Sequence, residues 1–199
     1  MQPKRKARGC GCIFSLLIVM AISVFVLILA MMPSGNPSPK DNASSSSTNT
    51  PEDWLAFDAR SWEDFVLFYN NHNSFMNSMT AYADGYIDKT SMYLKCEEAD
   101  SVFGGCSISV EYGENQEEKD YLSVLRSIAL SDQAAARSLK KYLNSGKTSD
   151  LADAQTNIEA AKNAVTLFAS NRGALLVKAG LSDEEIKQKV ESDMTALNQ

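Results

Sequence analysis

The chain has 199 residues, with 19 Lys or Arg and 25 Asp or Glu, so its formal net charge is −6. An acidic chain with a single histidine is a poor nucleic-acid binder, and we expect no nucleic-acid partner. A hydrophobic share of 44% excludes a wholly disordered chain, and four cysteines are too few for a scaffold built on disulfides.

Proline and charge are distributed unevenly along the chain. All five prolines lie in residues 1–51, which also hold five Lys or Arg but only one acid. Residues 52–199 contain no proline and hold 14 basic and 24 acidic residues, which gives them a net charge of −10. We therefore predict four segments: a basic cytoplasmic N-terminus at 1–12, a membrane span at 13–32, a linker at 33–51 and a folded domain at 52–199.

Residues 13–32 form an uncharged run of 20 mostly apolar residues. As a helix rising about 1.5 Å per residue, this run covers roughly 30 Å, the thickness of the hydrocarbon core of a lipid bilayer. The run is longer than the apolar core of a secretory signal, and no convincing small-x-small cleavage site follows it. The pattern favours an uncleaved signal anchor in the bilayer over a cleaved signal peptide.

Basic residues flank this span closely only on its N-terminal side, at Lys4, Arg5, Lys6 and Arg8. Since Lys and Arg resist translocation, we expect a single-pass protein of the cell membrane with its N-terminus in the cytoplasm and residues 33–199 outside. Cys10 and Cys12 lie at the cytoplasmic edge, where they are either palmitoylation sites or simply small residues at a helix start.

Residues 33–51 are rich in Pro, Ser, Asn and Thr and contain no large apolar residue. Such a segment cannot bury enough surface to offset the entropy lost on ordering. It predicts a tether that holds the folded domain away from the bilayer, and Asn42 within it matches the weak N-glycosylation pattern.

The first predicted helix of the domain has an apolar face with steps of three and four residues. That face consists of Trp62, Phe65, Tyr69, His72, Met76, Met79, Ala83 and Tyr86. Poor helix formers at residues 70–73 mark a place where this helix can break. One face cannot hold all its aromatic residues, so they either pack in the core or form a partner surface. That surface would comprise Trp62, Phe65, Phe68, Phe75 and Tyr82.

A non-helical excursion is predicted between the first and second helices. Gly104 and Gly105 indicate a turn, and residues 107–112 alternate as in a short strand. Cys96 and Cys106 are separated by nine residues and should be oxidised outside the membrane. The predicted disulfide would close a loop worth up to about 3 kcal/mol.

Three further helices follow in the sequence. Helical periodicity over residues 115–144 and from Ser149 predicts two helices joined by a short turn at Gly146, and hence antiparallel neighbours. Their apolar faces place Arg172 near Asp120, which predicts an ion pair, and leave Asp132 at the edge without an evident partner. A capping box at residues 182–185 predicts a last helix. The expected fold class is all-α, an antiparallel bundle of three to four helices.

The residues needed for catalysis or metal binding are mostly missing from the sequence. His72 is the only histidine and lies on an apolar face, so a hydrogen-bonded core histidine is the favoured interpretation. No catalytic or nucleotide-binding motif occurs, and the acidic residues between Glu111 and Asp120 lack the pattern of a calcium loop. We expect no catalytic residues, no metal, no cofactor and no enzymatic activity.

Two hypotheses for the function follow from these features. The first is a binding or scaffold module that engages another protein of the cell envelope, through the aromatic first helix or through residues 96–112. The alternative is a membrane-tethered sensor with a small molecule bound between helices near His72. The sequence shows no resemblance to a family that would decide between them.

Overall fold

The computed structural model describes residues 49–197, and within them the chain forms five helices and no strand. These are α2 (Pro51–Ala83), α3 (Lys89–Ser109), α4 (Gln116–Ser145), α5 (Thr148–Lys178) and α6 (Asp183–Leu197). The predicted all-α class is therefore confirmed. None of these five helices is long and apolar enough to span a bilayer. The predicted span at 13–32 and nearly all of the predicted linker lie outside the described residues.

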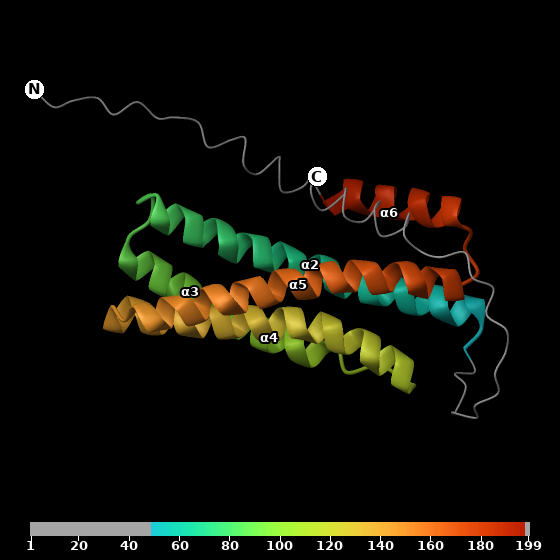
Figure 1. The fold of residues 1–199 in the computed structure, drawn as a ribbon, viewed down its shortest axis with the longest axis horizontal. Helices are drawn as coiled ribbons and strands as arrows, with labels where there is room; N and C mark the ends of the chain where they lie inside the picture. Colours follow the sequence, from blue (N-terminus) through green and yellow to red (C-terminus); the bar gives the residue numbers. More distant parts are fainter. Residues whose placement is uncertain (1–48, 198–199) are drawn as a thin grey trace, which may run out of the picture. The chain divides into compact units, whose positions relative to one another are not determined.

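Helices α2 to α5 form an antiparallel four-helix bundle. The chain runs back and forth along the bundle, each helix packs on the next, and α5 closes the ring by packing on α2 (Figure 1). Helices α2 and α4 face each other across the core, and α6 packs against α5. Short connections between successive helices are what this topology requires. The predicted number of helices was too low by one, because α3 had been interpreted as an excursion.

Helix α2 is held at its start by a capping box and stays helical through residues 70–73. The Thr50 hydroxyl accepts a hydrogen bond from the Asp53 amide at 3.3 Å, and the Asp53 carboxylate accepts one from the Thr50 amide at 2.8 Å. The expected break is absent because Phe68, His72 and Phe75 are buried in the core. Tertiary packing there outweighs the poor helix propensity of the neighbouring asparagines.

The chain just before α2 is also hydrogen-bonded to the first turn of α4. The Asn49 side chain donates to the carboxylate of buried Glu118 at 2.6 Å, and the Asn115 side chain donates to Asn49 at 3.4 Å. Glu118 also accepts a hydrogen bond from the Glu114 amide at 2.6 Å. The starts of α2 and α4 are therefore joined by a polar network.

Helix α3 replaces the predicted turn, strand and non-helical excursion, all of which were wrong. Its buried residues recur at helical spacing, and Gly104 lies inside it rather than in a turn. A Cβ atom at Gly104 would lie 2.7 Å from the side-chain nitrogen of Gln133 on α4. That nitrogen donates to the Asp100 carbonyl at 3.0 Å, so the glycine allows a close contact between α3 and α4.

The predicted disulfide between Cys96 and Cys106 is wrong as well. Both residues lie in α3, ten positions apart, which corresponds to about 15 Å along a helix. A disulfide needs Cα atoms about 4.4–6.8 Å apart. Both cysteines are free and buried, so they contribute to the core as small apolar side chains.

The predicted hairpin of α4 and α5 is confirmed. Gly146 ends α4 with a φ of 69°, a conformation that favours glycine. Near the other end of the hairpin, the rings of Tyr121 and Phe168 lie 5.1 Å apart, so the two helices remain in contact along their length. The capping box at the start of α6 is also present, since the Ser182 amide donates to Glu185 at 2.8 Å.

Candidate functional site

Besides Glu118 at the start of α4, buried charged side chains form two clusters in the bundle, and both involve α2. The first is the Arg172 cluster, which consists of Asp58, Trp62, Arg172, Lys189 and Asp193. The second is the His72 pair, which consists of His72 and Asp132. A shallow groove also lies on the surface of the described bundle, between α2 and α3.

The centre of the Arg172 cluster is a bidentate ion pair between α5 and α2. Arg172 is 2% exposed, and Asp58 is fully buried. The Nε atom of Arg172 donates to Asp58 Oδ1 at 2.7 Å, and its Nη2 atom donates to Oδ2 at 3.0 Å. Two parallel hydrogen bonds of this kind compensate for much of the cost of burying both charges.

Helix α6 and Trp62 complete the cluster. Arg172 Nη2 also donates to Asp193 Oδ2 at 2.6 Å, and the guanidinium lies 3.9 Å from the centre of the Trp62 ring. Lys189 Nζ lies 3.6 Å from carboxylate oxygens of both Asp58 and Asp193. Burial opposes the charge on Arg172, but the hydrogen bonds and charges of the two aspartates outweigh it and raise the pKa of Arg172. Arg172 is therefore charged and ties α2, α5 and α6 together.

The predicted pairing of Arg172 with Asp120 is wrong. Asp120 is exposed on α4 and accepts a hydrogen bond from Gln116, one turn earlier on the same helix. Arg172 turns instead toward α2 and α6, where two carboxylates lie within hydrogen-bonding distance. Sequence reasoning missed Asp58, Lys189 and Asp193.

The His72 pair joins α2 to α4 across the bundle. His72 Nδ1 lies 2.9 Å from each carboxylate oxygen of Asp132, which is fully buried. Burial raises the pKa of Asp132, while the hydrogen bond and charge of His72 oppose that shift. The prediction of a hydrogen-bonded core histidine is confirmed. The placement of Asp132 at an unpaired edge was wrong, because α2 faces α4 across the core.

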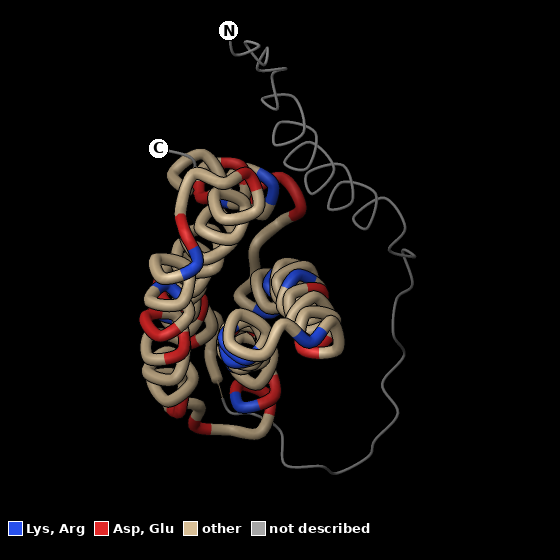
Figure 2. The backbone as a smooth tube through the Cα atoms, turned by 90° about the vertical axis from the view of Figure 1, so that its left-hand side faces the viewer, with Lys and Arg blue, Asp and Glu red and all other residues tan. Residues whose placement is uncertain are grey.

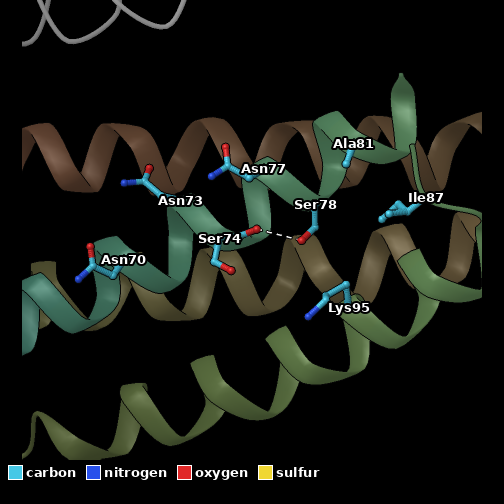
Figure 3. Close-up of a pocket in the computed structure, with 8 residues that line it drawn as sticks. All are labelled: Asn70, Asn73, Ser74, Asn77, Ser78, Ala81, Ile87 and Lys95. Atoms are coloured by element: carbon cyan, nitrogen blue, oxygen red, sulfur yellow. Dashed lines mark hydrogen bonds between the residues drawn. The ribbon is translucent and has the colours of Figure 1, made fainter. Parts of the chain in front are cut away.

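The groove has a volume of about 490 Å³, and its lining residues do not include His72. It is lined by Asn70, Asn73, Ser74, Asn77, Ser78, Ala81, Ile87 and Lys95. Figure 3 shows that α2 supplies six of these residues and that Lys95 comes from α3. The side chains of the three asparagines make no hydrogen bond within residues 49–197, so their amide groups are uncommitted.

The aromatic residues predicted as a partner surface lie mainly inside the bundle. Phe65, Phe68 and Phe75 are at most 4% exposed, so the surface interpretation is wrong for these three. Trp62 and Tyr82 are half-buried and pack against the core. The physical reason is that α2 contacts α3, α4 and α5, and the rings of Phe65, Phe68 and Phe75 lie on the side of α2 that the other helices enclose.

Exposed large apolar residues occur on each of the helices α2 to α5 and also on the loop before α3. Tyr86 is 83% exposed, Leu94 59% and Ile108 66%. Leu94 and Ile108 are 14 positions apart and therefore share one side of α3. Of the two, only Ile108 falls within residues 96–112, the second location that the sequence offered for a partner.

The described residues offer little for catalysis or metal binding. Burial raises the pKa of the Cys96 thiol to about 12, so it is not a ready nucleophile. Across residues 49–197, no group of three or more His, Cys, Asp or Glu side chains is placed to hold a metal ion. The buried charged groups described above are committed to one another.

Comparisons with known proteins found no matching family model, no similar curated protein and no similar solved structure. Evidence for a function therefore comes from the residues and surfaces of this chain.

Proposed function

We propose that the chain is a single-pass, membrane-anchored module that binds another protein of the cell envelope and does not catalyse a reaction. The apolar run at 13–32, the basic residues before it and the Pro/Ser-rich residues 33–51 support an anchor and a tether. The helical bundle then lies outside the cytoplasm. The evidence for the anchor and the tether comes from residues 1–51 and is independent of the evidence for binding, which comes from the helical bundle.

The observation that carries the binding proposal is the chemistry of the α2–α3 side of the bundle. We define this α2–α3 face by the uncommitted amides of Asn70, Asn73 and Asn77 together with exposed Leu94, which directly precedes Lys95 of the groove lining. Uncommitted amides can both donate to and accept from a partner, and exposed apolar side chains supply area that binding can bury.

Charge distinguishes the groove from the rest of the domain. Residues 52–199 carry a net charge of −10, and charged positions are found on several sides of the bundle (Figure 2). The groove lining contains no acid and one base, Lys95, which pairs with Glu98 at 2.7 Å. A protein partner can approach this lining without repulsion from acidic groups in it.

The alternative function, a sensor with a ligand near His72, has less support. His72 is buried, bonded to Asp132 and not part of the groove lining. A small molecule beside His72 would have to separate packed helices. We therefore favour protein binding at the α2–α3 face.

Site-specific photocrosslinking on the full chain in its native membrane tests this proposal. A crosslinking side chain at Asn73 or Leu94 should capture the same protein, identified by mass spectrometry and by reciprocal purification. The same side chain at Thr166, exposed on α5, should not capture it. Adding Asn70→Ala and Asn77→Ala should reduce capture from Asn73 several-fold. Equal capture from Thr166, or no capture from either α2–α3 position, would contradict the proposal.

The location of the domain needs a separate measurement. Because Cys96 and Cys106 are buried, a Ser101→Cys variant places an exposed thiol on α3. A membrane-impermeant maleimide should label this thiol on intact cells. Labelling only after lysis would place the domain in the cytoplasm and invert the proposed orientation.

A further inference from the structure

Helix α6 is held on the bundle by few buried side chains. Ile186 is its one buried residue among Asp183–Leu197, whereas Val190, Met194 and Leu197 are only half-buried. It packs on α5 at one side of the bundle (Figure 1). Detaching α6 therefore exposes less of its own apolar surface to water than detaching any helix of the four-helix core would expose.

Two polar contacts also attach α6 to the bundle, and both are made with the Asp58–Arg172 ion pair. Asp193 accepts from Arg172 at 2.6 Å, and Lys189 lies 3.6 Å from Asp58. The two hydrogen bonds between Arg172 and Asp58 join α5 to α2 and involve no atom of α6. The bundle therefore retains a neutralised pair beneath α6, with the Trp62 ring beside it.

Helix α6 also carries its own start signal. Gly180 adopts a φ of +82° between α5 and α6, which separates the two helices. The Ser182 amide and hydroxyl both donate to the Glu185 carboxylate, at 2.8 Å and 2.6 Å. These contacts lie within the segment itself, so they persist when α6 moves away from α5.

We propose that the surface beneath α6, formed by Asp58, Trp62 and Arg172, is a docking surface for a helix of a partner protein, and that α6 is its built-in competitor. The chemistry of the partner follows from the residues of α6. It is an amphipathic helix with an aliphatic residue in the position of Ile186, a base three residues later and an acid seven residues later. The base faces Asp58 and the acid faces Arg172, so charge complementarity fixes the register.

This inference goes beyond the proposed function, because it concerns a different surface and does not depend on the α2–α3 face. Its test uses the full chain in detergent micelles and a fluorescent peptide of residues 181–197. An Ile186→Ala/Asp193→Asn chain has a weakened α6 and should bind the peptide at least about tenfold more tightly than the unmodified chain does. A peptide with Asp193→Asn should bind this variant chain about fivefold more weakly than the native peptide, because it lacks the charged acceptor for Arg172.

A peptide with Glu191→Gln is the matched control, since Glu191 is exposed on α6 and its change should leave affinity unaltered. Thermal unfolding followed by circular dichroism checks that the variant chain keeps its bundle. If it does not, the Asp193→Asn chain alone serves for the same comparison. A folded chain with weakened α6 that binds no peptide, or that binds the native and Asp193→Asn peptides equally, overturns the inference.

Discussion

The two buried ion pairs of this bundle begin on the same helix but are built differently. Asp58 of α2 meets a guanidinium that makes two hydrogen bonds to it, and Asp193, Lys189 and Trp62 surround the pair. His72 of α2 meets a single carboxylate, Asp132. One pair has several compensating neighbours, and the other depends on two groups alone.

The two pairs differ in how they respond to a change of pH. Arginine keeps its charge at all accessible pH values, so the Asp58–Arg172 pair is insensitive to pH near neutrality. Burial raises the pKa of the Asp132 carboxyl, so the charge of this group in the α2–α4 pair depends on pH. The α2–α5 contact is thus fixed electrostatically, whereas the α2–α4 contact depends on proton occupancy.

The largest expected effect comes from Arg172→Met. This change leaves the fully buried Asp58 without its bidentate partner and should lower the free energy of unfolding by about 3–5 kcal/mol. Urea denaturation of the single variant and of the Asp58→Asn/Arg172→Met double variant measures it, and the double variant should recover part of the loss. Arg126→Met is the control, because the Arg126–Glu111 pair is exposed and should contribute less than about 1 kcal/mol. Equal losses for the two arginines would contradict the comparison.

A smaller loss is expected from His72→Leu. The change removes the only hydrogen-bond donor described for the Asp132 carboxylate and should cost about 1–3 kcal/mol. The loss is limited because Asp132 can take up a proton and become neutral. The same denaturation measurement applies, and a cost matching that of Arg172→Met would show that the two pairs are equivalent.

Asp193→Asn measures how much the contact from α6 adds to the stability of the Asp58–Arg172 pair. Since Arg172 and Asp58 retain each other, loss of this third charge should cost only about 1 kcal/mol. Thermal unfolding measures the change, with Glu191→Gln as a control on the exposed side of α6. A loss above about 3 kcal/mol would mean that the cluster cannot stand without α6.

The smallest expected effect is a change of stability with pH. An ordinary aspartate has a pKa of about 3.9, and burial raises the pKa of Asp132 in the folded state. The folded state therefore binds this proton more tightly, and the associated stability is complete below about pH 3.9 and lost as pH rises through the folded pKa.

Comparison of the native chain with Asp132→Asn isolates this contribution. The difference in unfolding free energy, native minus variant, should fall as pH rises above about 4, by at most about 1.4 kcal/mol per pH unit. Urea denaturation at a series of pH values measures it. A difference that rises with pH would contradict the direction of the Asp132 shift.

Local signals in the sequence predicted the parts of the fold that local interactions determine. The turn at Gly146 and the capping box at Ser182 are both present, because each depends on residues within one turn of a helix. Helix α3 was mistaken for an excursion because Gly104 and Gly105 normally mark turns. Its helical conformation is determined by packing on α4 and α2, which the local sequence does not show.

The ion pairs were only half predictable. His72, Asp132 and Arg172 each appeared as the polar member of an otherwise apolar helix face, which was the available signal that buried charges needed partners. The partners lie 60 and 114 positions away, so the choice among them required the arrangement of the helices. Asp58 was missed because the face considered began at Trp62, although Asp58 lies one turn earlier on it.

The polar network at Asn49 has a mechanical consequence. Asn49 precedes the capped start of α2 and is hydrogen-bonded to Glu118 and Asn115 at the start of α4. A pulling force applied through the preceding chain is therefore shared between α2 and α4, and it does not act on the first turn of α2 alone. The Asn49 contacts must break before a pulling force reaches the capped first turn of α2, so this end of the bundle is reinforced against pulling.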